Sequence, residues 1–401
     1  MDGIRTAGAE GVVRGRGAPA GPGLSGARRP TLRDRWRALR DRLLTSPEFH
    51  RRAASFPLTR PFVRHDARAL FDLVAGFTYS QVLLACVRLR VLETLAAEGP
   101  LAADELARRV GLPSEGAARL FAAAASLKLI EARDDGRWGL GRQGAPIVAL
   151  PSVAAMIEHH ATLYQDLVDP VALLRGERDT SMSGYWPYAD TAPGAAPEAL
   201  DEARVAEYSR LMSVTQPLVA EQVLDAYPFA RHRVLLDVGG GEGAFAIAAA
   251  HRAPSLRVKL FDLPAVAERA RERFAQAGLA DRARTYGGSF HADALPRGAD
   301  LVTLVRVLFD HPDERVLGIL KAARAALEPG GTLLVCEPMS GTPGAEAIGD
   351  AYYGLYLLAM GKGRSRRPQD IERLLREAGF ADVALLPTRL PLQTRVLRAR
   401  G

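Results

Sequence analysis

Glycine residues clustered between two apolar runs of the sequence could hold a nucleotide-like ligand. The first run ends in the segment Leu235–Gly243, LLDVGGGEG, which contains Gly239, Gly241 and Gly243. The second run, LRVKLFDLP, carries Asp262 about 20 residues after the last glycine, a spacing at which an acid accepts hydrogen bonds from both hydroxyls of a ribose. We therefore expect a cofactor site in which the glycines let the backbone approach the ligand and the acid binds its ribose.

The charge beside these glycines distinguishes two classes of cofactor. A dinucleotide site needs its third glycine after two intervening residues, to admit a pyrophosphate, whereas here the glycines occupy every second position. Asp237 lies just before them, where its negative charge would repel a pyrophosphate and attract the ammonium group of a methionine. The sequence therefore favours S-adenosylmethionine over a dinucleotide.

Strands and helices of the lengths that such a site requires alternate over residues 232–401. A strand over Val234–Val238 is followed by a helix that begins at Ala244. Further strands are expected in LRVKLFD, ARTYGGSF, ADLVTLVRVLF and TLLVCEPM and near 381–387, and further helices over 312–327 and 368–378. This alternation predicts an α/β fold, a mostly parallel, Rossmann-like sheet with helices on its faces.

Two short helices followed by a hairpin are expected over residues 100–145. The helices are LAADELARRVGLP, which ends at Gly111, and SEGAARLFAAAASLKLI, with Ser114 as its N-cap; the hairpin turns at Asp135 and Gly136. This order is typical of a winged-helix module. The second helix carries few cationic or amide side chains that could contact bases and phosphates, so we expect packing or dimerisation and no nucleic-acid binding.

The N-terminal part of the chain is expected to be an unfolded arm followed by helices. Residues 1–30 are rich in Gly, Ala, Arg and Pro without apolar periodicity, which predicts disorder. Thr31 is placed to cap a charged helix, TLRDRWRALRDRLL, and a longer helical stretch follows over Ala67–Glu98. Its most apolar part, Leu73–Val87, is interrupted by polar residues and predicts a buried helix rather than a membrane span.

Charge and cysteine content narrow the class of protein. The net charge of +7 is concentrated in residues 1–65, which hold 14 Arg against five Asp or Glu, so the rest of the chain is close to neutral. This basic region is a solvated tail or a segment that contacts an anionic membrane, with nucleic acid a distant third alternative. The two cysteines lie far apart and fit no metal or redox motif, which favours a reducing, cytoplasmic setting and no metal site. No signal-peptide pattern is recognised.

A chain of 401 residues is long enough for more than one domain. We expect a basic arm over 1–30, a helical and winged-helix dimerisation domain over 31–150, and a helical connection and substrate-site region over 151–230. This connection is interrupted by a Gly/Pro/Tyr-rich stretch, Ser181–Pro197. The Rossmann-like, S-adenosylmethionine-binding catalytic domain is expected over 231–401.

The glycine motif, the winged module and the segment EPGGTLLVCE together resemble the plant-caffeate-type class of small-molecule O-methyltransferases, over residues 65–390 or thereabouts. This class pairs a winged-helix dimerisation domain with a Rossmann-like domain, so the resemblance implies a homodimer that acts on a small molecule. It places Glu337, in CEPM, at an acid that flanks the catalytic base. The cofactor contacts that the resemblance and the motif imply are Asp237, Gly239, Gly241, Gly243, Asp262, Leu263, Gly288, Ser289, Phe290 and Arg306.

Three departures from this class change the expected chemistry. Phe309 occupies the position of the class's catalytic histidine, Gly288 that of an acid which contacts the adenosine, and Ser365 lies near the position of the second acid that flanks the base. Because a histidine removes the proton of a phenol readily but not that of an aliphatic alcohol, the missing histidine favours a weakly acidic alcohol as substrate. Catalysis would then depend on aligning the alcohol oxygen with the sulfonium and on excluding water.

Candidate bases lie on two segments. His311 is two residues from Phe309, and His159 and His160 belong to a helix before the α/β domain. The candidate catalytic residues are therefore His311, His160 and Glu337, unless the enzyme uses no dedicated base. The apolar helix AYYGLYLLAMG is either core or the lining of a lipophilic pocket. In the second case the substrate contacts are His159, Phe309, Tyr352, Tyr353, Tyr356 and Met360.

The segments GGSF, VRVLFDH and MIEHHATLY resemble most the carotenoid-tailoring branch of this class, whose members methylate the tertiary 1-hydroxyl of acyclic carotenoids in phototrophic bacteria. The resemblance implies a lipophilic substrate and peripheral contact of the basic arm with the inner, photosynthetic membrane. Two alternatives stay open. One is an enzyme of the same fold that methylates, hydroxylates or decarboxylates a polyketide or phenol. The other is a winged-helix regulator that binds a ligand through its α/β domain.

Overall fold

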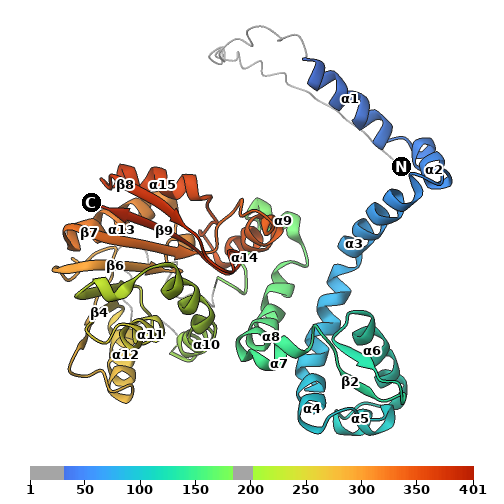
Figure 1. Cartoon of the computed structure of the whole chain (residues 1–401), viewed down its shortest axis with the longest axis horizontal. Coiled ribbons are helices and arrows are strands. Elements are labelled where there is room, and N and C mark those ends of the chain that lie inside the picture. Colours follow the sequence, from blue (N-terminus) through green and yellow to red (C-terminus); the bar gives the residue numbers. More distant parts are fainter. Residues whose placement is uncertain (1–30, 184–201) are drawn as a thin grey trace, which may run out of the picture. The chain divides into compact units, whose positions relative to one another are not determined.

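Figure 1 shows a computed structural model of the chain, which describes residues 31–183 and 202–401. The chain divides into two compact units, with the boundary between Thr78 and Tyr79. The disorder expected for residues 1–30 lies outside the described residues, and so does most of the stretch 181–197.

The described part of the first unit is helical. It consists of α1 (Leu32–Leu44), α2 (Pro47–Ser55) and the first part of α3 (Arg60–Arg88). The predicted cap of the first helix is confirmed. Thr31 Oγ1 accepts a hydrogen bond from the Asp34 backbone N–H at 3.2 Å, and the Asp34 carboxylate accepts one from the Thr31 N–H at 3.0 Å. This reciprocal pair satisfies two backbone donors that would otherwise lack partners at the start of α1.

The prediction that Leu73–Val87 is a buried helix is wrong for most of its length. The Leu73 and Phe77 side chains of α3 are 81% and 75% exposed, and burial begins only at Leu84. Apolar residues indicate that a helix packs against an apolar surface, but they do not indicate which part of the protein supplies that surface. Among the described helices, α3 is long and apolar enough to cross a membrane by length and composition, a test that a core helix of a soluble protein also passes.

The second unit opens with the predicted winged-helix module. Its elements are α4 (Val91–Glu98), α5 (Ala103–Arg109), α6 (Ser114–Ser126), β1 (Ile130–Ala132) and β2 (Trp138–Leu140). The two strands pair antiparallel, with Ile130 opposite Leu140. Ser114 is not the N-cap of α6, because Pro113 takes that position without a side-chain hydrogen bond.

The apolar side of α6 is buried inside its own module. Ala117, Phe121 and Ala124 belong to a core cluster that also holds α4 and α5 side chains. On its outer side Arg119 forms an ion pair with Glu115 at 2.6 Å. The helix therefore presents a neutralised surface, as expected for a packing element and not for one that reads DNA.

Helices then lead into the central sheet. They are α7 (Ala145–Ala149), α8 (Pro151–Asp166), α9 (Pro170–Arg175) and α10 (Glu202–Ala226). The described part of the sheet has the strand order β5-β4-β3-β6-β7-β9-β8. Its strands are β3 (Val234–Val238), β4 (Arg257–Asp262), β5 (Ala283–Gly287), β6 (Ala299–Val305), β7 (Leu327–Glu337), β8 (Asp382–Leu386) and β9 (Arg395–Arg400).

The predicted α/β fold is confirmed. β3 to β7 pair in parallel, whereas β9 runs antiparallel between β7 and β8. β9 was not predicted, because its sequence, RVLRAR, carries three arginines and no long apolar run. Its position between two strands is a long-range pairing that its own sequence does not signal.

Helices cover both faces of the sheet (Figure 1). They are α10, α11 (Ala244–Arg252), α12 (Pro264–Gln276), α13 (Asp313–Ala326) and α15 (Pro368–Glu377). A π-helix over Ala347–Tyr352 leads into α14 (Tyr353–Met360), which packs with α8 and α9, and 3-10 turns lie over Phe229–Arg231 and Leu308–Asp310. One core cluster packs beneath α13 and α15, and a second beneath α10, α11 and α12. A third cluster joins α8, α9 and α14 to Phe309.

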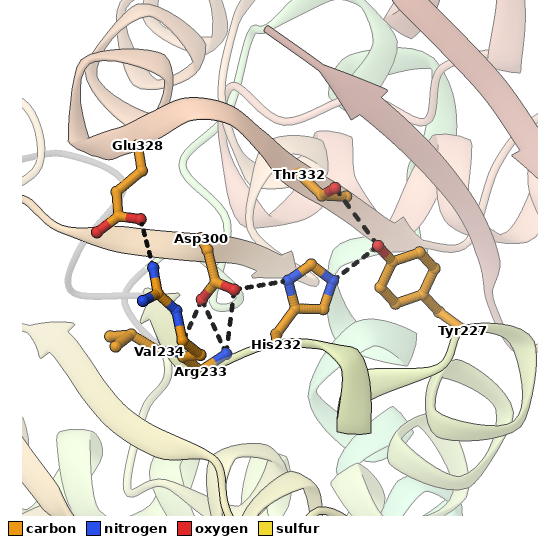
Figure 2. A network of polar contacts seen from close by, with 7 residues as sticks. All are labelled: Tyr227, His232, Arg233, Val234, Asp300, Glu328 and Thr332. Atoms are coloured by element: carbon orange, nitrogen blue, oxygen red, sulfur yellow. Dashed lines mark hydrogen bonds and ion pairs between the residues drawn. The ribbon is translucent and has the colours of Figure 1, made fainter.

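A polar network joins the amino ends of three parallel strands (Figure 2). The Asp300 carboxylate of β6 accepts hydrogen bonds from the backbone N–H groups of Val234, at 2.7 Å, and Arg233. It also contacts His232 Nδ1 at 3.2 Å, while His232 Nε2 lies 2.8 Å from the Tyr227 hydroxyl. This His–Asp pair fixes the start of β3 and lies at the sheet end opposite the glycine loop.

Candidate active site

A pocket opens at the carboxyl ends of β3, β4 and β6, where the strand order reverses. Ligands of open parallel sheets bind at such a reversal. Most of the residues predicted to bind the cofactor line this pocket: Gly239, Gly241, Asp262, Leu263, Gly288, Ser289, Phe290 and Arg306. The other two, Asp237 and Gly243, are not among the lining residues.

Glycine is needed at the three positions of the loop for different structural reasons. Gly241 has a φ of +58°, and a Cβ placed on it would meet no atom within 4 Å, so it faces the open pocket. Gly239 has a φ of +68°, and a Cβ there would lie 2.8 Å from Val307 Cγ2. Gly243 caps α11 at a φ of +83°, with the Phe274 ring 3.0 Å from a Cβ. Left-handed backbone favours glycine at all three positions, and close packing requires it at Gly239 and Gly243 as well.

Asp262 stands at the end of β4, as predicted. Its Oδ2 accepts a hydrogen bond from Gly241 N at 2.8 Å, and its Oδ1 accepts one from Leu263 N at 2.7 Å. Burial raises the pKa of Asp262 to about 6, against the effect of these two bonds. A carboxylate has about four acceptor sites, so this group can hold the loop and still accept from a ribose diol.

Asp237 lies buried beneath the loop, close to Gly240. Its Oδ1 accepts a hydrogen bond from Thr303 Oγ1 at 2.7 Å, and its Oδ2 has no hydrogen-bond partner among the described residues. Burial, and then the charge of Asp262, raise the pKa of Asp237 to about 7. A buried carboxylate oxygen without a partner suits a cationic ligand group, so the donor set fits the ammonium-bearing S-adenosylmethionine.

Three rings meet at one end of the pocket. The His311 ring lies 5.5 Å from the Phe290 ring and 5.0 Å from the His291 ring. Burial is the main cause that lowers the pKa of His311, to about 3, with contributions from the neighbouring cations. His311 is therefore neutral at physiological pH, and it lines the pocket. His291 was not singled out from the sequence, because nothing in its local pattern places it beside the other rings.

Phe309 points into a different cluster from His311. Its buried side chain packs with Met360 and with the tyrosines of the 347–360 segment, its ring 6.4 Å from that of Tyr353. His160 Nε2 lies 2.8 Å from the Tyr352 hydroxyl, and His159 Nε2 lies 2.9 Å from the Tyr356 hydroxyl. The structure thus brings together all the predicted substrate contacts, in a cluster beside the pocket at the ends of β3, β4 and β6.

The histidines of this cluster are held in the neutral form. Burial, together with the neighbouring His160, lowers the pKa of His159 to about 4, and burial lowers the pKa of His160 as well. Burial raises the pKa of the Tyr352 hydroxyl, so this group keeps its proton. The two His–Tyr pairs are therefore neutral hydrogen-bonded pairs that could orient a hydroxyl or accept its proton.

Two buried acids lie behind Phe309. Glu337 Oε2 accepts a hydrogen bond from the Phe309 N–H at 3.1 Å, and burial raises the pKa of Glu337 to about 7. Asp310 lines the pocket, and neither of its oxygens has a hydrogen-bond partner among the described residues. Burial, and then the charge of Glu337, raise the pKa of Asp310 well above its usual value. Sequence reasoning missed Asp310, since an acid in a loop gives no sign of being buried.

Two arginines form hydrogen bonds that hold the segments around Phe309 in place. Arg306, with a φ of +57°, donates to Thr215 Oγ1 at 2.9 Å and to the Met212 carbonyl at 3.2 Å, both on α10. Arg366 is buried and donates to the carbonyls of Leu308 and His311, at 2.9 and 2.5 Å. The predicted contact of Arg306 with the adenine side stays a prediction, while its observed bonds tie α10 to the end of β6.

Comparison with known proteins identifies the family. Residues 164–381 match the model of the O-methyltransferase domain, and residues 71–148 match that of the O-methyltransferase dimerisation domain. The chain belongs to the O-methyltransferase family. It is 45% identical over 346 residues to the demethylspheroidene O-methyltransferase of Cereibacter sphaeroides, covering 86% of this chain and 90% of that protein. It is 41% identical over 360 residues to the enzyme of the same name from Rhodobacter capsulatus, covering 89% and 88%.

Solved structures agree with this assignment. Human N-acetylserotonin methyltransferase in complex with S-adenosylmethionine superposes with a TM-score of 0.68, at 26% identity, over 84% of this chain and 98% of that one. The predicted class, fold, enzyme type and S-adenosylmethionine cofactor are thereby confirmed at the level of the family. Membership favours the enzyme over the winged-helix regulator.

Proposed function

We propose that this O-methyltransferase methylates the tertiary 1-hydroxyl of an acyclic carotenoid, as a demethylspheroidene or hydroxyneurosporene O-methyltransferase. The observation that carries the proposal is the position of Phe309. The family's catalytic histidine is expected there, but this apolar side chain packs among tyrosines and Met360, beside the cofactor pocket. The similarity to two demethylspheroidene O-methyltransferases over most of the chain supports the same substrate class.

The chain's own groups divide the work between two adjoining regions. When bound, S-adenosylmethionine supplies an electrophilic methyl group on a sulfonium. We assign the glycine loop, Asp262 and Asp237 to holding the ribose and the ammonium group. Phe309, Tyr353 and the other apolar side chains of the 352–360 segment would exclude water and hold the polyene, so that the alcohol oxygen is aligned for attack.

The proton of the alcohol must leave as the new C–O bond forms, and three groups are candidates to accept it. His160 belongs to the substrate cluster and is neutral, so it can accept a proton. His311 is neutral and lies on the cofactor side, and Asp310 lines the same pocket. We assign Glu337 to holding the backbone of Phe309 in place.

We further propose a homodimer that works in the cytoplasm, at the periphery of the inner photosynthetic membrane, on a lipophilic small molecule and not on nucleic acid. The dimerisation-domain match and the exposed apolar side chains of α3 support the dimer. The basic N-terminal region supports membrane contact. The domain limits 31–150, 151–230 and 231–401 are part of this proposal; the family match over 71–148 lies within the first, and the match over 164–381 extends across parts of the other two.

The purified protein, incubated with methyl-labelled S-adenosylmethionine and a panel of hydroxyl compounds, tests this function. The panel holds an acyclic 1-hydroxycarotenoid in detergent, a small phenol and a hydroxylated polyketide. We expect label in the carotenoid only, with a product heavier than the substrate by one CH₂. Methylation of the phenol alone would overturn the substrate class. Gain of oxygen or loss of CO₂ in the polyketide would instead support the second enzyme class.

A further inference from the structure

α1 carries a stripe of apolar side chains that nothing in the described part of the chain covers. Leu32 and Trp36 are 84% and 66% exposed, Leu39 and Leu43 are also exposed, and the helix has no buried residue. With about 100° of rotation per residue, these four side chains fall within a sector of about 60°. They form one narrow apolar stripe along the helix.

Arginines border this stripe on both sides. On the same helical rotation, Arg33 and Arg40 flank one edge, and Arg35 and Arg42 flank the other. The two acids of α1, Asp34 and Asp41, fall on the opposite face. Asp41 pairs with Arg40 at 2.7 Å, but both side chains are more than half exposed, so the pair leaves the positive border largely intact.

An apolar stripe bordered by cations, with acids on the far side, is complementary to an anionic lipid surface. Apolar side chains enter the boundary between headgroups and acyl chains, and arginines beside them reach lipid phosphates. α1 has 13 residues, about 20 Å, too short to cross the roughly 30 Å hydrocarbon core. A helix of this length and pattern lies in the plane of the interface.

The place of α1 in the chain and the charge around it agree with this match. The family's dimerisation domain matches from residue 71 onward, so α1 lies outside it. Residues 31–65 hold nine Arg against three Asp or Glu, whereas 1–30 hold five against two. Most of the basic charge of the N-terminal region therefore belongs to the described helices and not to the arm.

We propose that α1 is an interfacial helix that binds the surface of an anionic bilayer, with Leu32, Trp36, Leu39 and Leu43 inserted below the headgroups. The advantage of this membrane binding for the enzyme rests on the proposed function, because a membrane-dissolved polyene would be taken up at the same surface. Its binding does not depend on that function and can be measured without any carotenoid.

Sedimentation of the full chain with vesicles tests the binding. We expect binding to vesicles of phosphatidylcholine and phosphatidylglycerol in equal amounts, little binding to phosphatidylcholine alone, and weakening by salt. The double variant Trp36→Gln, Leu39→Gln should bind at least about tenfold more weakly, since two large side chains no longer insert. The matched control Ala38→Gln, Leu44→Gln also replaces one leucine, but off the stripe, and should bind as the native protein does.

Tryptophan fluorescence gives a second measurement of insertion, and a folding defect would not produce the same result. The chain has three tryptophans, so Trp138→Phe with Trp186→Phe leaves Trp36 as the only one. Its emission should shift to the blue on addition of anionic vesicles, and not on addition of zwitterionic ones. No shift, or equal sedimentation of the stripe variant and its control, would overturn the proposal.

Light scattering of the Trp36→Gln, Leu39→Gln variant distinguishes binding of the stripe to lipid from binding of the stripe to a second copy of this chain. The variant should keep the oligomeric state of the native protein, and a change of state would show that the stripe contacts another copy instead. Turnover on the carotenoid in detergent should also be unchanged. Detergent turnover reports on the proposed function alone, so that function and the membrane helix can fail independently.

Discussion

At the residue scale, the surroundings of Phe309 define what the site can deprotonate. A polar group placed there would have to be desolvated among apolar side chains. We expect Phe309→His to leave turnover on the carotenoid alcohol unchanged or lower, and to permit slow methylation of a small phenol. Phe309→Leu, which keeps the pocket apolar, is the control. Strong acceleration on the native alcohol by the histidine variant would show that the substrate is acidic.

The proton acceptor can be identified by comparing His311→Ala, His160→Ala and Asp310→Asn. We expect the acceptor's variant to lose about 100-fold or more in kcat with cofactor affinity kept. The pH dependence of kcat distinguishes the candidates further. A base is active when deprotonated, so His311, with a pKa of about 3, predicts a kcat that is flat from pH 5 upward, whereas Asp310, with its raised pKa, predicts a kcat that rises with pH. Losses below about threefold in all three would leave positioning as the source of catalysis.

Cofactor affinity should depend on the loop and on its two acids. Gly241→Val fills the space above the loop, and Asp262→Ala removes two ribose hydrogen bonds of about 1 to 1.5 kcal/mol each, a loss of roughly 30- to 150-fold. Asp262 and Asp237 have raised pKa values of about 6 and 7, so both become protonated as pH falls. Affinity for S-adenosylhomocysteine, measured by calorimetry, should therefore weaken below pH 7. Unchanged affinity in both variants would move the site away from this loop.

At the scale of elements, the Asp300 network holds the amino ends of β3 and β6 together (Figure 2). Burial opposes ionisation of this carboxyl, but the N–H groups of Val234 and Arg233 and the His232 ring lower the pKa of Asp300. A lowered pKa means that its stabilisation is present above the unfolded value of about 4 and is lost as pH falls through the folded value.

Asp300→Asn should therefore lower the free energy of unfolding by about 1 to 3 kcal/mol at pH 7, because backbone donors lose a charged acceptor. The measurement is denaturant unfolding at pH 7 and at pH 3, where the difference from the native chain should shrink. Glu328→Gln is the control, since its ion pair with Arg233 is exposed and worth less than about 1 kcal/mol. Equal stability of Asp300→Asn and the native chain at pH 7 would show that the network does not stabilise the fold.

Elements with a strong local pattern could be predicted from the sequence, and long-range contacts could not. The strand Val234–Val238 and the acid at the end of β4 follow from apolar runs with glycines at fixed spacing. The exposure of Phe77, the burial of Asp310 and the insertion of β9 depend on what lies opposite them in space. Ser114 shows the same limit locally, because α6 begins at this good capping residue and has Pro113 as its N-cap.

At the scale of the whole molecule, exposed apolar surface shows where a second chain would bind. The winged module was the expected site, but α6 buries its apolar side in its own core. The uncovered side chains belong instead to α3, where Leu70, Leu73, Val74 and Phe77 are each more than 60% exposed. A surface of this kind on a protein with a dimerisation domain points to α3 as part of the proposed dimer interface.

The double variant Leu73→Glu, Phe77→Glu tests this interface. Burying two carboxylates against a partner is costly, so the variant should be monomeric at micromolar concentration, where the native chain runs as a dimer in light scattering. Leu385→Glu with Leu392→Glu also adds two charges at exposed leucines, but in and after β8, and should stay dimeric. A native chain that is monomeric, or that stays in solution only with detergent, would contradict the dimer. In the second case α3 would be covered by lipid and not by a second chain, since its length and composition also suit a membrane span.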